Sequence, residues 1–436
     1  MLQVLVEVFY KKMIYHLFFC SIVFVENLFY NLIGDFMERI IFHIDVNNAF
    51  LSWTAVKLLN EGYKIDIREI PSVIGGDESS RHGIVLAKSP VAKKYGVVTA
   101  ETLYSARKKC PFLKTFPSDM KYYREMSSKM IEYISNYSPD LEQFSIDECF
   151  LDLTGTSYLY DDVIQLAYKI KDEIYEKFGF TVNIGIANNK LCAKMASDFL
   201  KPNKVHTLFD SEVKEKMWPL PIDELFMVGK KTANKLHMMG LHTIGEVANS
   251  DVNRLVKEFK SFGLSLYEHA NGIDNSIVDS NISENKSISV SWTIDHDTDD
   301  VFEIKKILLK QVDEVGRSLR RKKLYANVVA VTFKTSDFVS FSKQSTVDYP
   351  INSNEDIYDN VIKILYKAWN FEKIRNIGIR LTNFTDSRLA QSNLFDIDAE
   401  KNENREKIQS VLDKIKDKYG TDIINPASLL DTDKKN

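Results

Sequence analysis

The chain has 436 residues, which is too long for one ordinary hydrophobic core and suggests roughly three domains. With 44% hydrophobic and 27% charged residues, its composition excludes the disordered and fibrous classes. The formal net charge of −4 excludes a uniformly basic nucleic-acid binder, so any binding to nucleic acid must come from local basic patches.

Residues 1–36 form an apolar and aromatic N-terminal extension. Residues 13–32 suggest a signal peptide or membrane anchor, but Glu26 places a charge inside the stretch and no small-residue cleavage site stands out. Met37 opens a sequence that fits the first strand of a domain. We therefore expect an upstream extension or a mistaken start without stable membrane association, which N-terminal sequencing of the native protein would test.

Strand and helix patterns alternate from residue 38 to residue 209. Their order follows no strict βαβ period, which favours an α+β palm-like sheet over a Rossmann fold. The predicted strands are 40–45, 83–87, 143–146, 149–153 and 181–187, and the predicted helices are 48–60, 121–136, 161–178 and 188–200.

The rest of the chain predicts a helical region and a second α+β unit. Residues 210–270 look helical, and the polar stretch 271–286 looks like a tether because it lacks apolar periodicity. Residues 399–436 are charged and contain one amphipathic helix. The second unit has predicted strands at 288–293, 325–335 and 374–384 and predicted helices at 301–322 and 355–371.

The most informative residues are three carboxylates near strand ends. Asp45 ends the first strand, and Asp147 and Glu148 stand between two strand-like runs about a hundred residues later. Neighbouring side chains on a strand point to opposite faces, so Asp147 and Glu148 share one site only at a bend or hairpin tip. Converging carboxylates need cations, and all-oxygen ligation is typical of Mg²⁺. This spacing alone leaves open ordinary exposed turn acids.

Several motifs occur in the order found in one family. These are Ile44-Asp45, Ser145-Ile146-Asp147-Glu148, residues 185–198 and Lys201-Pro202-Asn203. Together they resemble the Y-family translesion DNA polymerases, most closely the bacterial polymerase IV and polymerase V groups, over residues 38–398.

The resemblance implies a multidomain α+β fold shaped like a right hand. The expected parts are the palm (37–48 and 120–208), fingers (49–119), a helical thumb with a helix-hairpin-helix (209–275), a linker (276–287), a little finger (288–398) and a charged tail (399–436).

The resemblance also implies a reaction. A polymerase of this family adds dNTPs to a primer 3′-hydroxyl on template DNA, including damaged DNA, with low fidelity and no proofreading. Asp45, Asp147 and Glu148 would hold two Mg²⁺ ions, with the Val46 carbonyl as a backbone ligand. Phe50 matches the aromatic steric gate that excludes a ribose 2′-hydroxyl, although the spacing alone favours a core aromatic on an amphipathic helix.

Two lysines match positions that contact the triphosphate. Lys201 matches a family contact directly, whereas the finger segment carries Pro90 and Lys93 where the family usually has a Tyr and an Arg. Lys93 supplies the charge but not the bidentate fork of an arginine. The alternative for Lys93 is a solvated helix face.

DNA contacts are expected in the thumb and the little finger. A helix-hairpin-helix presents backbone N–H groups to a phosphate without reading sequence, although Met227 replaces its usual first glycine. The alternative for the thumb motif is a helical packing element without a role in DNA binding. The alternative for the arginines of the little finger is a solvated charged face. The candidate DNA-binding residues are Gly229, Lys230, Lys231, Thr232, Arg321 and Arg380.

A short peptide beyond the last predicted strand fits a docking motif. Gln391, Leu394 and Phe395 match the Q-x-x-L-F type by which bacterial polymerases bind the sliding clamp, with Leu and Phe as apolar anchors.

The four cysteines have neither metal nor disulfide spacing. They are Cys20, Cys110, Cys149 and Cys192. Buried thiols in a reducing compartment are the simplest account, which predicts a cytoplasmic protein.

Two other functions remain open from the sequence. A nucleotidyl cyclase also places paired acids on a palm-like hairpin, but it has no use for a hairpin thumb or a clamp peptide. Retention of the acidic trio argues against a catalytically impaired polymerase-like adaptor, whereas Pro90 and Lys93 leave that hypothesis open.

Overall fold

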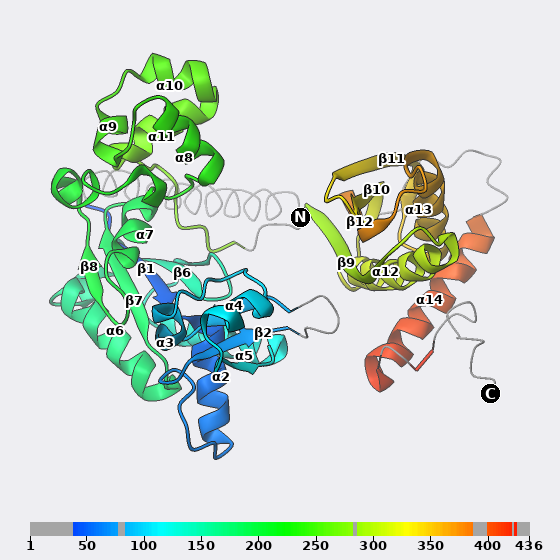
Figure 1. The fold of residues 1–436 in the computed structure, drawn as a ribbon, viewed down its shortest axis with the longest axis horizontal. Coiled ribbons are helices and arrows are strands. Elements are labelled where there is room, and N and C mark those ends of the chain that lie inside the picture. Colours follow the sequence, from blue (N-terminus) through cyan, green and yellow to red (C-terminus); the bar gives the residue numbers. More distant parts are fainter. Residues whose placement is uncertain (1–37, 77–82, 282–285, 387–398, 421–422, 425–436) are drawn as a thin grey trace, which may run out of the picture. The chain divides into compact units, whose positions relative to one another are not determined.

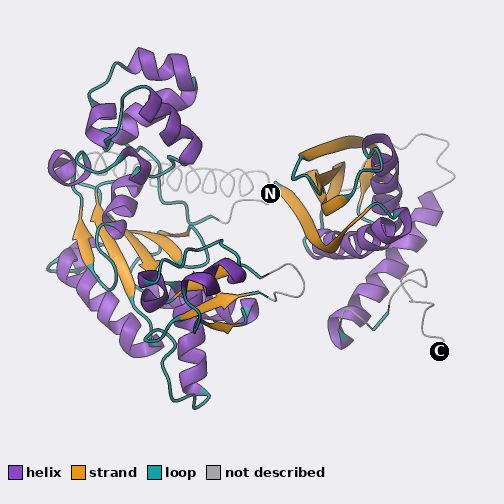
Figure 2. Ribbon diagram, in the orientation of Figure 1, coloured by secondary structure: helices purple, strands orange, loops and turns teal. Residues whose placement is uncertain are grey.

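The computed structural model describes residues 38–76, 83–281, 286–386, 399–420 and 423–424. The extension 1–36 and the clamp-type peptide with Gln391, Leu394 and Phe395 lie outside the described residues. No helix within the described ranges is both long and apolar enough to cross a membrane. The described residues form two compact units, one made of residues 38–76 and 84–281 and the other of the described residues from 286 onward (Figures 1 and 2).

A five-stranded sheet in the order β5-β6-β1-β7-β8 is the centre of the first unit. Strand β1 is buried along its whole length, His43 and Asp45 included, and pairs antiparallel with β6 and β7. The elements are β1 (Ile41–Val46), β5 (Leu141–Gln143), β6 (Glu148–Asp152), β7 (Val182–Ala187), β8 (Val205–Thr207), α2 (Ala49–Asn60), α5 (Met120–Ile134), η1 (Ser157–Leu159), α6 (Val163–Phe178) and α7 (Lys190–Asp198).

The two faces of this sheet have different partners. Phe42 and Ile44 of β1 pack in one core with residues of α2, α5 and α6. Ile41 points to the other face, where it packs with α7 and with the helices that follow. Because side chains alternate along a strand, Asp45 lies on the α7 face together with Ile41.

A three-stranded sheet in the order β3-β2-β4 adjoins α2. Strand β2 is antiparallel to β3 and parallel to β4, and Val73, Val85 and Leu103 share its small core. The elements are β2 (Ser72–Gly75), β3 (Val85–Lys88), α3 (Pro90–Lys94), α4 (Leu103–Lys109) and β4 (Lys114–Phe116).

Short helices complete the first unit and pack on α7. Leu236, Leu241 and Leu255 are buried in the same core as Leu191 and Met195 of α7. The elements are η2 (Asp210–Glu212), η3 (Val213–Met217), η4 (Ile222–Glu224), α8 (Lys230–Met238), α9 (Ile244–Ala248), α10 (Val252–Phe259) and α11 (Ser261–Ala270).

The second unit is a four-stranded antiparallel sheet in the order β11-β10-β12-β9. Helices α12 and α13 pack on one face, where Val331 and Ile379 meet Leu308 and Val361 (Figure 1). The elements are β9 (Ser287–Thr298), α12 (Val301–Arg321), β10 (Tyr325–Thr335), β11 (Ser340–Ile351), α13 (Asn354–Ala368), β12 (Ile374–Thr385) and α14 (Ala399–Tyr419).

The structure confirms most predicted elements and corrects some. The strand predicted at 143–146 was wrong: β5 ends at Gln143, and residues 144–147 form a turn because two of their N–H groups bond the Glu148 carbonyl. Strands β2, β4, β8 and β11 were not predicted. Cys110, Cys149 and Cys192 are free and buried, as expected.

Parts of the expected linker and tail are hydrogen-bonded or ion-paired within their own units. Asp274 accepts a hydrogen bond from the Leu191 N–H (3.1 Å), and the Asp279 N–H donates to Glu142 (2.9 Å). The predicted C-terminal helix is α14, whose Asp413 forms an ion pair with Arg320 of α12 (2.6 Å). Both segments are therefore attached, at least in part, to the unit in which they lie.

We predict that Gly185→Ala destabilises the first unit. Helix α7 approaches β7 so closely that a Cβ on Gly185 would stand 2.0 Å from the Ala193 carbonyl oxygen and 2.5 Å from the Ser197 nitrogen. Such overpacking costs about 1–3 kcal/mol or more, measurable as a lower free energy of unfolding in urea. Gly155→Ala is the matched control, since nothing lies within 4 Å of its Cβ. Equal stabilities of the two variants would contradict the close packing.

Candidate active site

Two acidic side chains meet at one end of the five-stranded sheet. Asp45 and Glu148 are partners in the antiparallel β1–β6 pair, so both side chains leave the sheet on the same face. The turn 144–147 precedes Glu148, and the Ser145 N–H donates to the Glu148 carbonyl (3.1 Å). Asp147 therefore lies at a hairpin tip beside Glu148, the position that the sequence predicts for this pair.

Main-chain and side-chain bonds position Asp147. The Val46 N–H donates to the Asp147 carbonyl (3.0 Å), which joins the turn to the end of β1. The Ser145 hydroxyl donates to Asp147 Oδ1 (2.6 Å), and Ser145 Oγ accepts from the Asp147 N–H (3.3 Å). The hairpin tip is thus held close to Asp45 by Val46, the next residue along the chain.

Lys201 reaches Asp45 from the segment after α7. Its ammonium group donates to Asp45 and also forms an ion pair with Asp198 (2.8 Å). Burial raises the pKa of Asp45 to about 6, although Lys201 opposes this rise. Burial also disfavours the Lys201 ammonium, but Asp45 and Asp198 outweigh it and raise the pKa of Lys201.

A second lysine neutralises Glu148. Lys194 of α7 is buried, and its Nζ lies 2.9 Å from Glu148 Oε1 and 3.4 Å from Asp198. Burial raises the pKa of Glu148, but His43 and Lys194 outweigh it and lower that pKa to about 2. The candidate site therefore alternates carboxylates and ammonium groups.

His43 lies beneath these residues on the same face of β1. It is fully buried, its Nδ1 is 2.8 Å from Ser197 Oγ, and its Nε2 lies 3.6 Å from Glu148 Oε2. The Nε2 atom has no hydrogen-bond partner at this distance. Burial lowers the pKa of His43 and outweighs Glu148, which acts to raise it. The net effect favours a neutral imidazole.

The acidic trio is not gathered around one point in this structure. Among the described residues, no group of three or more His, Cys, Asp and Glu side chains is arranged to hold a metal ion. Asp45 and Glu148 each bind a different lysine, and Asp147 binds Ser145. The ammonium groups supply the positive charge that clustered carboxylates require.

Phe50 is the second residue of α2, just beyond β1. Its ring stacks on Tyr123 of α5, with centroids 4.8 Å apart and planes 10° apart. The Thr54 hydroxyl donates to the Phe50 carbonyl (2.8 Å) and lies 2.7 Å from the Tyr123 hydroxyl. Phe50 is only partly buried, so it supports the core on one side and remains accessible on the other.

Strand β3 and helix α3 bring cationic residues beside the start of α2. Asn48 donates to the Lys88 carbonyl (2.6 Å), which ties the end of β3 to the residue before α2. Burial and then the nearby Lys93 ammonium lower the pKa of Lys88. Pro90 is the first residue of α3, where a proline costs no hydrogen bond, and Ser89 caps the helix.

The predicted helix-hairpin-helix ends in α8. Met227, which replaces the usual glycine, has φ of 71°, the left-handed conformation that glycine adopts without strain. Gly229 is the N-cap of α8, and Lys230 and Lys231 are exposed in its first turn while Thr232 is partly buried. The hairpin thus keeps the expected backbone despite its different side chain.

The second unit has a polar sheet face opposite its helices. The register aligns Ala330, Arg380 and Ser289 across three strands, and Arg380 is exposed. The residues of β9 and β11 on this face are mainly hydroxyl or amide side chains: Ser287, Ser289, Ser291, Thr293, Ser340, Ser342, Gln344 and Thr346.

Arg321 has different surroundings from Arg380. It lies at the end of α12, in the layer that covers the core face of the sheet, and donates to Asp417 of α14. Arg317 shares the same carboxylate (2.7 Å). The two expected arginine contacts therefore belong to opposite layers of the second unit.

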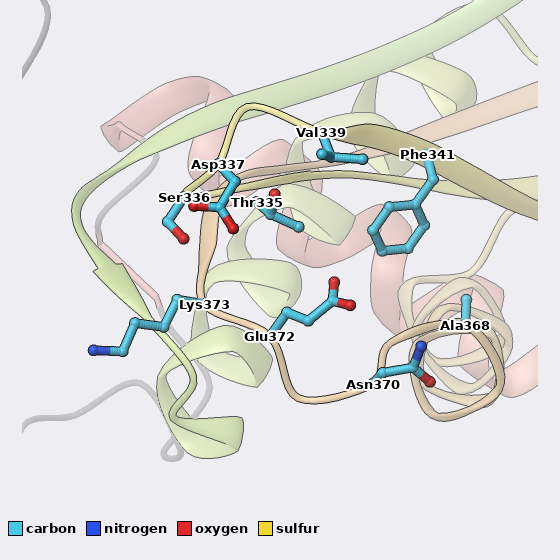
Figure 3. A pocket seen from close by; sticks show the side chains of 9 residues that line it. All are labelled: Thr335, Ser336, Asp337, Val339, Phe341, Ala368, Asn370, Glu372 and Lys373. Atoms are coloured by element: carbon cyan, nitrogen blue, oxygen red, sulfur yellow. The ribbon is translucent and has the colours of Figure 1, made fainter.

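A cavity of about 420 Å³ opens near the β10–β11 turn of the second unit (Figure 3). Asp337 and Glu372 contribute carboxylates, Phe341 contributes an apolar wall, and the buried Thr335 hydroxyl has no hydrogen-bond partner. None of the expected site residues lines it.

Comparison with known proteins gives consistent matches. Residues 44–198 match the impB/mucB/samB family, residues 285–394 match the C-terminal domain of that family, and residues 210–241 match its HHH motif. DNA polymerase IV of Clostridium acetobutylicum is 46% identical over 400 residues, which cover 92% of this chain and all of that protein.

More distant relatives agree. DNA polymerase IV 1 of Bacillus subtilis is 33% identical over 394 residues, which cover 90% of this chain and 94% of the relative. A solved Y-family DNA polymerase chimera has a TM-score of 0.70 and 25% identity, covering 80% of this chain and all of the solved chain.

Proposed function

The chain belongs to the impB/mucB/samB family of Y-family DNA polymerases, and on this premise we propose that Asp45, Asp147 and Glu148 form its nucleotidyl-transfer centre. The protein is a DNA-directed DNA polymerase of translesion synthesis. The observation that carries the assignment is the β1–β6 register, which sets Asp45 opposite Glu148 while Val46 holds the tip that bears Asp147.

The donor set fits Mg²⁺. Carboxylate oxygens are the ligands that Mg²⁺ prefers, and Asp45, Asp147 and Glu148 supply them together with the main-chain carbonyl of Val46. Lys194 and Lys201 already supply positive charge at Glu148 and Asp45, so the site accommodates cations. Two Mg²⁺ ions bound to these residues would stabilise the charge on the attacking and leaving oxygens.

The surrounding residues bind and orient the substrates. Lys201 would contact the triphosphate if a cation replaced it at Asp45, and Lys93 with Lys88 would add positive charge from the fingers. A several-fold rise in the KM for dNTPs on replacing Lys201 or Lys93 by Met would support these roles. An unchanged KM would contradict them.

Primer–template DNA, damaged DNA included, is held by exposed polar surfaces in each unit. Gly229, Lys230, Lys231 and Thr232 present an N-terminal helix turn to a phosphate, and Arg380 lies on the polar sheet face. Arg321 could join them only by leaving Asp417. Loss of a lysine contact should reduce the salt dependence of DNA affinity, whereas an unchanged slope would argue against that contact.

We also assign the protein to the bacterial cytoplasm. The relatives are bacterial DNA polymerases, and the described cysteines are free thiols, as a reducing compartment favours. Recovery of the native protein in a membrane or secreted fraction would contradict this location.

Asp147→Asn is expected to abolish primer extension with Mg²⁺. The carboxamide keeps the size of the side chain but removes the charge, and several kcal/mol of lost stabilisation correspond to at least about a 100-fold slower reaction. Single-dNTP extension of an undamaged and a lesion-bearing template measures the rate. Asp140→Asn, an exposed change at the far end of β5, should leave the rate unchanged. Near-normal extension by the Asp147 variant would refute the assignment.

Phe50→Ala is expected to weaken selection against ribonucleotides. The ring is fixed by its stacking on Tyr123, so it cannot yield easily to a 2′-hydroxyl. The ratio of kcat/KM for dNTP and rNTP should fall by about 10–200-fold, the range for steric exclusion of a small group. Phe112→Ala, which removes an exposed aromatic of the same unit, serves as the control. A variant that excludes rNTPs as well as the parent argues for a purely structural Phe50.

Leu394→Ala with Phe395→Ala is expected to remove stimulation by the bacterial sliding clamp. The anchors of the Gln391, Leu394 and Phe395 peptide fill an apolar pocket on such a partner, while distributive synthesis does not require them. Extension with and without a loaded clamp gives the measurement. Ser392→Ala, inside the same peptide, controls for local changes. Stimulation that survives the double change would locate the clamp contact elsewhere.

A further inference from the structure

Two histidines of the first unit face each other through their ring nitrogens. His237 is the last residue but one of α8, and His242 lies just before α9, after a turn at Gly240. Their Nδ1 atoms are 3.1 Å apart, and the ring planes differ by only 23°. Both side chains are partly or fully accessible to solvent.

A carboxylate fixes the tautomer of His237. Its Nε2 lies 2.7 Å from Asp223 Oδ2 of η4, and a carboxylate accepts but does not donate. The Nε2 therefore carries the proton, and in the neutral ring the Nδ1 lone pair points at His242. In many metal sites the N–H of one ring nitrogen of a histidine donates to a carboxylate, and the lone pair of the other nitrogen binds the metal.

Main-chain hydrogen bonds fix the segment that carries His242 relative to η4 and α9. The Ile222 N–H donates to the His242 carbonyl (2.9 Å), which ties η4 to the residue before α9. Glu246 accepts from the His242 and Thr243 N–H groups (2.5 and 3.0 Å) and completes a capping box. The imidazole pair is therefore prearranged by the fold, since no long flexible loop separates its members.

We propose that His237 and His242 form a binding site for a late first-row divalent metal ion, with Asp223 as the residue that orients His237. Imidazole nitrogen suits Zn²⁺, Ni²⁺ and Cu²⁺, and it discriminates against Mg²⁺. Zinc–nitrogen bonds of about 2.0–2.1 Å at a tetrahedral angle place two ligand nitrogens about 3.4 Å apart, close to the spacing seen here. Water completes the coordination, because this face is open to solvent.

Metal binding needs one proton to move. In the neutral pair His242 donates its Nδ1 proton to His237, and the metal takes the two Nδ1 lone pairs only after that proton leaves. The proton that leaves His242 Nδ1 is replaced by one that His242 Nε2 takes up from solvent. The ring stays neutral, and no net proton is released. The bound metal would then link the C-terminal end of α8 to the segment before α9, with η4 held to His237 through Asp223.

Zinc titration of the full chain in excess Mg²⁺ tests the site. Mg²⁺ occupies oxygen ligands elsewhere, and ¹⁵N-histidine NMR reports which ring nitrogens respond. We expect one Zn²⁺ equivalent that shifts the Nδ1 signals of His237 and His242 and is lost in His237→Gln and in His242→Gln. Asp223→Asn should weaken the affinity by about 10–100-fold, as is typical for a residue that orients a metal ligand.

His296→Gln is the matched control, because His296 also lies beside a carboxylate, Glu303 (3.3 Å), without a second imidazole. Its Zn²⁺ binding should equal that of the parent. The proposal is overturned if the parent shows no saturable Zn²⁺ binding, if the equivalent survives in the His237→Gln and His242→Gln variants, or if the NMR signals show only a proton shared by the pair. Circular dichroism of each variant establishes that the fold is retained.

Discussion

The antiparallel register between β1 and β6 is the constraint on which the active site depends. It aligns Asp45 with Glu148, and the same strand pair places His43 beside Phe150 in the layer beneath. Because side chains alternate between faces, a slip of one residue would send Glu148 into the core formed with α2, α5 and α6. The apolar residues of β1 on that core face therefore hold the proposed catalytic acids in position, although they have no proposed part in the chemistry.

Charge compensation is the second requirement of the site. Two partly buried carboxylates at neighbouring strand ends cannot remain ionised without cations. Lys194 and Lys201 meet this need from α7 and from the segment that follows it, and Asp198 forms ion pairs with both. The close approach of α7 to Gly185 brings Lys194 within reach. Under the proposed function, substrate and metal binding would exchange one cation for another, because Mg²⁺ at the carboxylates would free the lysine ammonium groups for the triphosphate.

The sequence predicted the strong features and missed those that depend on tertiary contacts. The strand ending at Asp45, the hairpin before Glu148 and the long helices were clear from apolar periodicity and capping residues. Strand β11 was not predicted because most of its residues are polar and exposed, so apolar and polar residues do not alternate along it. Lys194 and Tyr123 had no local signal, since their partners Glu148 and Phe50 lie far away in the sequence. The β1–β6 register, which brings Asp45 opposite Glu148, arises from the pairing of the two strands and cannot be read from the sequence of either strand alone.

An acidic chain that binds DNA must do so without a broad positive field. The candidate DNA-binding surfaces resolve this in two ways: the start of α8 offers main-chain N–H groups, and the outer face of the second sheet offers hydroxyl and amide groups around Arg380. Such contacts would act at short range and would not distinguish sequences, because phosphates carry no sequence information. Met227 keeps the hairpin backbone at the cost of a left-handed residue, which indicates that the geometry of these main-chain donors matters more than the side chain that precedes them. For a polymerase that extends primers past damaged bases, contacts made by the backbone and by small polar groups tolerate the irregular duplex that a basic, sequence-reading surface would reject.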